Sequence, residues 1–382
     1  MKNYICEQLG IDVPVFAFTH SPDVVIAVSN AGGMGVLGAA GMGPEKLDQA
    51  LQKITEACPG KSFGVDLILP NNYVGKEQGG LDINSLKTQI PEGHKSFLED
   101  LLKQYDVAEI DADQANAFTS TFGQSVTYKG ARTLAEIALS YPIKLLVNAL
   151  GTFPAEFREK AHSLGIKTGA LVGQVKHAIR QKEAGVDVII AQGYEAGGHT
   201  GDIATMALVP QVVDAVAPIP VLAAGGVADG RQLAAALALG AQGAWTGSVW
   251  LMSKEAETHP VVKEKFKEAD ASQTLRSRST TGKHARQLRS AWTDAWENPD
   301  NPNPLPMPLH SMLIDNAQRR IKEDANQGRK GGKELINYFV SQNVGLFTEE
   351  RPAAEILEDM VKECDEVLGR IGGLANSKTN KS

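Results

Sequence analysis

The chain has 382 residues, of which 42% are hydrophobic and 22% charged, the composition of a globular protein with a large core. Its formal net charge is −7 and no block of like charges occurs, which argues against a nucleic-acid partner. The three cysteines, Cys6, Cys58 and Cys364, form no metal-ligand motif, and the chain shows neither a signal-peptide core nor a membrane-length apolar run. We expect a cytoplasmic protein that acts on a small molecule, binds no metal or membrane, and is a monomer or a homo-oligomer.

Short apolar segments alternate with helical patterns along most of the chain. We predict helices at Asp23–Asn30, Pro44–Cys58, Pro154–Leu164, Val175–Ala184 and Asp229–Leu239. The predicted strands are Val13–Phe18, Gly35–Ala39, Phe63–Leu69, Lys144–Ala149, Lys167–Val172, Val186–Ala191, Pro220–Ala224 and Gly243–Val249. Strands that alternate with helices in this way predict an α/β fold, a (β/α)8 TIM barrel formed by residues 1–251. No GxGxxG motif follows the first strand, which disfavours a dinucleotide-binding fold.

Several segments depart from this alternation. Residues 70–140 are too long for a loop and carry helical patterns at Ser96–Tyr105 and Ala131–Tyr141, so we predict a helical insertion. Residues 252–345 are polar and helical in pattern, and we predict that they form a small cap domain over the barrel mouth. Residues 346–375 are expected to form a C-terminal helix that packs on the barrel, and residues 376–382 a disordered tail.

The segment Val186–Gly201 carries the strongest functional signal. A buried strand is followed by a loop rich in glycine, which holds the titratable side chains Glu195 and His199. Parallel α/β enzymes place such residues at the carboxyl ends of their strands. His199 is therefore a candidate acid or base, because a histidine with a pKa near 6.5 can exchange a proton at neutral pH.

A second glycine-rich region resembles a phosphate site. Gly225 and Gly226 follow the seventh predicted strand, and Thr246-Gly247-Ser248 lies near the end of the eighth. TIM barrels bind phosphate with the loops after these two strands, through backbone N–H groups. We therefore predict that this region cradles one phosphate group, and that Asp229 caps the helix that follows.

Two stretches carry a family resemblance. AQGYEAGGHTG at 191–201 and LAAGGVADGRQLAAALALGAQGAWTGS at 222–248 resemble the nitronate monooxygenase family, formerly called 2-nitropropane dioxygenase. The resemblance covers roughly residues 10–70 and 142–250, and TTGKHAR at 280–286 is similar to a segment of the family's cap. It implies an FMN-dependent TIM-barrel oxidoreductase with His199 as the catalytic residue.

The resemblance also implies which residues bind the cofactor. They are Ala17, Phe18, Asp66, Gln192, Gly197, Gly198, Gly225, Gly226, Gly247 and Ser248. The chain departs from the family at two of these places. Pro14–His20 reads PVFAFTH where the family has proline-methionine-alanine, and Asp66 stands where asparagine is frequent. Both departures lie where the flavin ring is expected.

Several side chains keep two interpretations. Glu195 either orients His199 or caps a turn, and Asp66 either faces the flavin or pairs with a base such as Lys61. His20 either lines the substrate site or is a solvated loop residue. Lys283 and Arg286 either meet an anionic substrate or a nicotinamide phosphate, or lie on a solvated surface of the cap.

The predicted activity is oxidation of alkyl nitronates or nitroalkanes by O2 to a carbonyl compound and nitrite, with FMN as cofactor. One alternative is an NAD(P)H-dependent FMN reductase of quinones or enoyl thioesters, which would use the same flavin site. Another is a barrel that binds a phosphate ligand without redox chemistry, because a phosphate cradle alone would serve it equally well.

Overall fold

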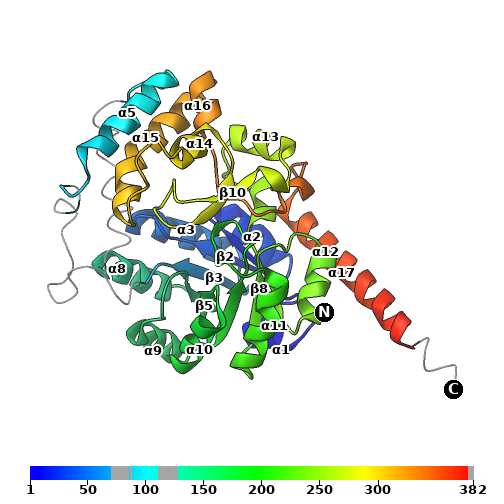
Figure 1. Ribbon diagram of the computed structural model, residues 1–382. Coiled ribbons are helices and arrows are strands. Elements are labelled where there is room, and N and C mark those ends of the chain that lie inside the picture. The colour runs from blue at the N-terminus through cyan, green and yellow to red at the C-terminus, as the bar shows by residue number, and fades with distance from the viewer. Residues whose placement is uncertain (70–85, 87, 111–127, 377–382) are drawn as a thin grey trace.

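The computed structural model describes residues 1–69, 86, 88–110 and 128–376. Eight parallel strands close into a barrel in the order β1-β2-β3-β4-β5-β6-β8-β9, surrounded by helices (Figure 1). These strands are β1 (Val15–Thr19), β2 (Met34–Gly38), β3 (Phe63–Leu67), β4 (Leu145–Asn148), β5 (Lys167–Val172), β6 (Val188–Gln192), β8 (Val221–Ala224) and β9 (Gly243–Thr246). Each corresponds to a predicted strand, so the TIM barrel is confirmed.

A ring of helices covers the barrel. Its members are α2 (Pro22–Asn30), α3 (Pro44–Ala57), α8 (Tyr128–Leu139), α9 (Ala155–Ser163), α10 (Val175–Glu183), α11 (Thr205–Val216) and α12 (Gly230–Ala238). The sequence did not predict α11, because Pro210 lies inside it and proline normally breaks a helical pattern. Helix α8 packs on α3 and β3 and so occupies the barrel position after β3, although its residues were expected to belong to the insertion.

The C-terminal helix completes this ring. Helix α17 (Ala353–Asn376) packs against α12 and α2 through the buried residues Leu357, Met360 and Cys364. The short helix α1 (Tyr4–Leu9) contributes Ile5, Cys6 and Leu9 to the cluster inside the barrel. The tail expected to be disordered lies, from residue 377 on, outside the described residues.

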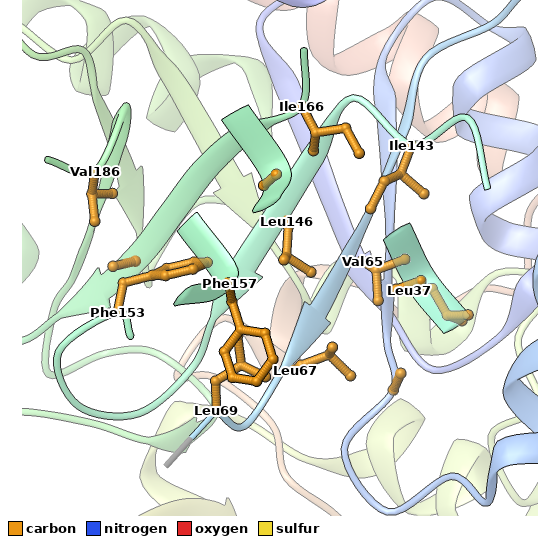
Figure 2. Packing of buried hydrophobic residues seen from close by; sticks show 14 of the residues in the cluster. Leu37, Val65, Leu67, Leu69, Ile143, Leu146, Phe153, Phe157, Ile166 and Val186 are labelled. Atoms are coloured by element: carbon orange, nitrogen blue, oxygen red, sulfur yellow. The ribbon is translucent and has the colours of Figure 1, made fainter. Parts of the chain in front are cut away.

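The apolar side chains on the outer side of the strands show which residues face the barrel interior. The layer between strands and helices includes Val65 and Leu67 of β3 and Leu146 of β4, packed against Phe157 of α9 (Figure 2). Because side chains alternate along a strand, the residue between Val65 and Leu67 points inward. That residue is Asp66, at the carboxyl end of β3.

Residues 252–345, the segment expected to form a cap, combine helices with a small sheet. Their helices are α13 (Pro260–Glu268), α14 (Ala291–Glu297), α15 (Leu309–Asn326) and α16 (Lys330–Leu335), and α5 (Glu92–Gln104) packs on α15. The unpredicted strands β10 (Thr274–Ser277) and β11 (Ala285–Leu288) form an antiparallel sheet with β7 (Gly198–His199). Among the described helices, none is both long and apolar enough to cross a membrane.

Candidate active site

His199 lies where the barrel meets the cap. It belongs to the two-residue strand β7, in which His199 pairs with Ala285 of β11, and not to a loop as the sequence suggested. The imidazole Nε2 lies 2.8 Å from Thr281 Oγ1, and the ring centroid lies 6.4 Å from that of Phe339. Thr281 and Phe339, both from residues 252–345, therefore flank the imidazole.

The surroundings of His199 keep its imidazole uncharged. Burial, and secondly the positive charge of Lys283, lower the pKa of His199 to about 4. Lys283 itself is exposed and lies two residues beyond Thr281. At neutral pH the site therefore presents a neutral imidazole and a nearby ammonium group.

Glu195 stabilises the start of α11. Its Oε2 accepts hydrogen bonds from Thr205 N at 2.9 Å and Thr205 Oγ1 at 2.8 Å. A carboxylate at this end complements the helix dipole. A Cβ on Gly193 would overlap Thr205, so the chain at Gly193 passes close to the start of α11. Of the two interpretations of Glu195, the structure supports a capping carboxylate, which here lies at the start of helix α11.

The glycines expected to bind phosphate lie where β8 and β9 end, next to the loop that follows β6. Gly225 and Gly226 adopt φ of +93° and +72°, and a Cβ on Gly225 would lie 2.9 Å from Ala196 N. Ser248 Oγ accepts a hydrogen bond from Ser341 N at 2.8 Å. Within the described part of the chain, the N–H groups of Gly225, Gly226 and Gly247 bond no backbone acceptor. These backbone donors are therefore free to bind an anion.

Gly197 and Gly198 connect this cradle to His199. A Cβ on Gly197 would lie 2.9 Å from the carbonyl carbon of Val340, so the loop after β6 packs directly on residues 340–341. Gly198 adopts φ +75°, with open space at its Cβ position. Positive φ is readily adopted only by glycine and turns the chain into β7. The glycines thus set the path that carries His199 to the cap.

The end of β1 contributes aromatic residues to the same mouth. Phe18 stacks on Trp245 with ring centroids 5.9 Å apart and meets His20 edge-on at 5.3 Å. His20 Nδ1 lies 2.7 Å from Gly38 O, which orients its ring. The ring keeps accessible surface, yet desolvation by the surrounding protein lowers the pKa of His20. The Ala17 side chain packs in the outer layer, so only its backbone can reach a ligand at the mouth.

Asp66 of β3 and Gln192 of β6 both face the barrel interior. Asp66 is 3% exposed, its Oδ1 has no hydrogen-bond partner, and it forms no ion pair with any described residue. Burial raises the pKa of Asp66 well above its ordinary value. The pairing with Lys61 does not form, and Asp66 instead presents an unsatisfied polar atom. Gln192, at the last position of β6, is half-buried.

Arg286 is not a surface residue. It is 2% exposed, donates hydrogen bonds from Nε and Nη2 to Tyr194 O, and stacks over the Tyr194 ring at 4.5 Å. The expected position on a solvated surface of the cap is therefore wrong for this residue. Its guanidinium instead fixes the cap sheet to the loop after β6.

The sequence analysis missed three further residues at the site. Thr281, Phe339 and Ser341 all come from residues 252–345, and each contacts a candidate residue from far along the chain. Thr281 lies inside the TTGKHAR segment, which was the only available signal. Elsewhere in the described ranges, no group of three or more His, Cys, Asp or Glu could hold a metal ion.

Comparison with known proteins gives consistent similarities. A model of the family described as nitronate monooxygenase matches residues 6–363. The chain is 50% identical over 374 residues to the protein Rv1533 of Mycobacterium tuberculosis, named as a monooxygenase, covering 98% of this chain and 99% of the relative. It is 27% identical to a protein named as a nitronate monooxygenase in Bacillus subtilis, covering 95% and 98%.

Solved structures share the fold. FabK from Thermotoga maritima superposes with a TM-score of 0.69 at 25% identity, covering 98% of this chain and 99% of that one. Nitroalkane oxidase from Streptomyces ansochromogenes superposes with a TM-score of 0.77 at 23% identity, covering 96% and 99%. At that identity the second similarity concerns the fold alone.

Proposed function

This chain belongs to the nitronate monooxygenase family and is an oxidoreductase, and we propose that it uses FMN and O2 to oxidise alkyl nitronates to a carbonyl compound and nitrite. The observation that carries the choice of substrate is the position of His199, whose imidazole lies 2.8 Å from Thr281 and close enough to Lys283 for that positive charge to lower its pKa.

The barrel mouth fits FMN in two respects. The free N–H groups of Gly225, Gly226 and Gly247, with Ser248, suit one phosphate group. Asp66 Oδ1 is buried and unpaired at the end of β3, where a polar edge of the flavin ring would satisfy it. We assign Phe18, Gln192, Gly197 and Gly198, together with the Ala17 backbone, to the remaining contacts. Bound FMN would take electrons from the substrate and pass them to oxygen.

His199 is better suited to bind an anion than to remove a proton from carbon. A group with a pKa near 4 is a weak base at neutral pH, so deprotonation of a neutral nitroalkane would gain little from it. A nitronate has already lost that proton. Its negative charge is attracted by Lys283, and its oxygens can accept a hydrogen bond from the neutral ring.

Thr281 decides which ring nitrogen carries the hydrogen. The Thr281 hydroxyl has two acceptors within reach, His199 Nε2 at 2.8 Å and the backbone oxygen of Lys283 at 3.3 Å, and its oxygen accepts from Lys283 N at 3.3 Å. We assign the hydroxyl hydrogen to this shorter contact, so that Nε2 accepts and Nδ1 carries the ring hydrogen. Nδ1–H is then the donor available to a nitronate oxygen.

We further propose that residues 252–345 act as the cap of this site, with His20 and Lys283 on the substrate side. The observation behind this assignment is the sheet in which β7, which carries His199, pairs with β11. A cap that holds the reactive side chain can exclude water from the substrate while oxygen still enters.

The test is an anaerobic absorption spectrum of the purified protein before and after an alkyl nitronate, with NADH and NADPH in parallel. Bleaching of a bound flavin by nitronate alone, followed by nitrite release when oxygen enters, is the expected result. Bleaching by NADH or NADPH instead would establish the reductase alternative. A protein without flavin that also fails to bind added FMN would leave the non-redox phosphate-binding barrel.

A further inference from the structure

His310 is a buried histidine that bonds two separate segments of the chain. It is 0% exposed, lies in the first turn of α15, and meets Trp296 of α14 edge-on with ring centroids 4.6 Å apart. Its Nε2 lies 2.9 Å from Ser279 O, and its Nδ1 accepts a hydrogen bond from Leu305 N at 3.3 Å. A ring that only filled space would need no nitrogen, whereas both nitrogens of this ring are engaged.

These two contacts determine which nitrogen of His310 carries the ring hydrogen. A backbone N–H can only donate, so Nδ1, which accepts from Leu305, carries no hydrogen. Burial lowers the pKa of His310 to about 4, so the ring is neutral at pH 7 and holds a single N–H. That hydrogen is on Nε2, which donates to the carbonyl of Ser279.

The Ser279 carbonyl begins the turn that carries Thr281. Trp292 Nε1 donates to the same oxygen at 3.1 Å, so side chains from α14 and α15 hold one carbonyl together. The turn closes through a 2.9 Å hydrogen bond from Gly282 N to Arg278 O. Thr281 lies between these two anchors, and its position therefore depends on both.

Leu305 supports the other side of this turn. Gly282 adopts φ +80°, and a Cβ added to it would overlap Leu305 O, so the two backbones are in direct contact. Helices α14 and α15 lie side by side above this region (Figure 1). His310 bonds the N–H of Leu305 and also bonds the turn, so it joins the turn to the segment on which the turn rests.

We propose that His310 is a positioning residue of the candidate active site: its ring holds the turn so that the Thr281 hydroxyl stays 2.8 Å from His199 Nε2. By fixing that contact, His310 also fixes the tautomer in which His199 carries its hydrogen on Nδ1. Its own bonds go to Ser279 and Leu305, so it acts on His199 through the turn. The use of that Nδ1–H by a nitronate rests on the proposed function, whereas the positioning of Thr281 does not.

The test locates the ring hydrogens by 15N nuclear magnetic resonance of the full chain, labelled at histidine, as purified and without substrate. The chain has eight histidines, and the variants His199→Asn and His310→Gln assign the two signals of interest. In the wild type, His199 should carry its hydrogen on Nδ1 and His310 on Nε2. A wild-type His310 with its hydrogen on Nδ1 would overturn the proposal, whatever the variants do.

His310→Phe keeps an aromatic ring against Trp296 and removes both nitrogens. The His199 signal should then move toward a mixture of tautomers. The amides of Gly282 and Lys283, which are hydrogen-bonded within the turn, should exchange their hydrogens about tenfold faster than in the wild type. His310→Gln keeps a donor and an acceptor and should restore most of both properties.

Ile321→Ala is the matched control for a general loss of packing. Ile321 is 0% exposed in the same helix, about three turns beyond His310. Its truncation should destabilise α15 and leave the His199 tautomer and the exchange of the turn amides unchanged. A folded His310→Phe variant with wild-type tautomer and exchange, or an Ile321→Ala variant that alters both as strongly, would contradict the positioning role.

Turnover gives a separate readout. In His310→Phe, kcat/KM for an alkyl nitronate should fall about tenfold, and the double variant with Thr281→Val should lose no more than either single variant, because both changes remove the same contact. Losses that multiply would show that His310 acts elsewhere and would overturn the proposal. If the chain does not oxidise nitronates, the resonance and exchange results still decide the role of His310.

Discussion

The imidazole of His199 and the hydroxyl of Thr281 are 2.8 Å apart, although 82 residues separate them in the chain. Removing the hydroxyl with Thr281→Val should leave Nε2 without its partner and lower kcat/KM for a nitronate about tenfold, the effect of one hydrogen bond worth about 1.4 kcal/mol. Thr281→Ser keeps the hydroxyl and should retain most of the activity. Equal loss in both variants would mean that the methyl packing matters and the hydrogen bond does not.

His199→Ala should keep its flavin and lose turnover. The phosphate cradle and the inward side chains of the barrel do not depend on this ring, so the protein should stay yellow. Removing one positioned hydrogen-bond donor to an anion is expected to lower kcat by roughly 100-fold to 1,000-fold. The measurement is steady-state nitrite release together with the flavin content per chain. Full activity in this variant would remove His199 from the mechanism.

The pKa of His199 also predicts a pH dependence. Because it is about 4 in the folded protein and 6.5 in its ordinary state, the unfolded chain binds a proton first as the pH falls. Stability from this group is therefore complete above pH 6.5 and is lost progressively toward pH 4. His310, whose pKa burial also lowers to about 4, adds in the same direction. Urea unfolding of His199→Asn between pH 7 and 4 should show a smaller decline than the wild type.

Asp66 should change the stability with pH in the opposite direction to His199. Its folded pKa is raised by burial, so between its ordinary value near 3.8 and the raised value the folded state holds a proton that the unfolded state has lost. Stability of the flavin-free protein should therefore fall as the pH rises through that window. Asp66→Asn carries no titratable group and should remove this decline, which unfolding midpoints across pH 4 to 8 would measure. An unchanged slope would show that other groups cause it.

Gly225→Ala tests the cradle. The φ of +93° and the 2.9 Å approach of a Cβ to Ala196 N both oppose a side chain there, so the change should cost about 1–3 kcal/mol and weaken FMN binding. Gly151→Ala is the control, because Gly151 has φ +80° with nothing within 4 Å of its Cβ position. If both variants lose equal stability, the contact with Ala196 contributes nothing beyond the strained φ.

The barrel was predictable because each of its strands is a short apolar run bounded by glycine, proline or polar residues. Burial on both faces of a parallel sheet produces that pattern directly. The cap sheet was not predictable for the opposite reason. Strand β11 carries Arg286 and Gln287, which look solvated in the sequence but are buried because Tyr194 and cap residues supply their hydrogen bonds.

The candidate site, like the fold, was only partly predictable from the sequence. Glycines that adopt positive φ, such as Gly225, are recognisable from the strand before them and the helix after them. Contacts between distant segments are not, because neither partner carries a pattern of its own. Ser341 N, which donates to Ser248 Oγ across 93 residues, is ordinary in sequence and is defined only by the folded chain.

The pairing of β7 with β11 has a consequence for how such an enzyme can change over time. A barrel that merely carried a lid could exchange lids freely and acquire new substrates with each exchange. Here His199 belongs to strand β7, which is part of the lid's sheet. A replacement lid must therefore supply an edge strand in register with Gly198 and His199. It must also supply a hydroxyl at the place of Thr281. Any recombined or designed relative that keeps this barrel inherits that requirement, and the two halves must change together.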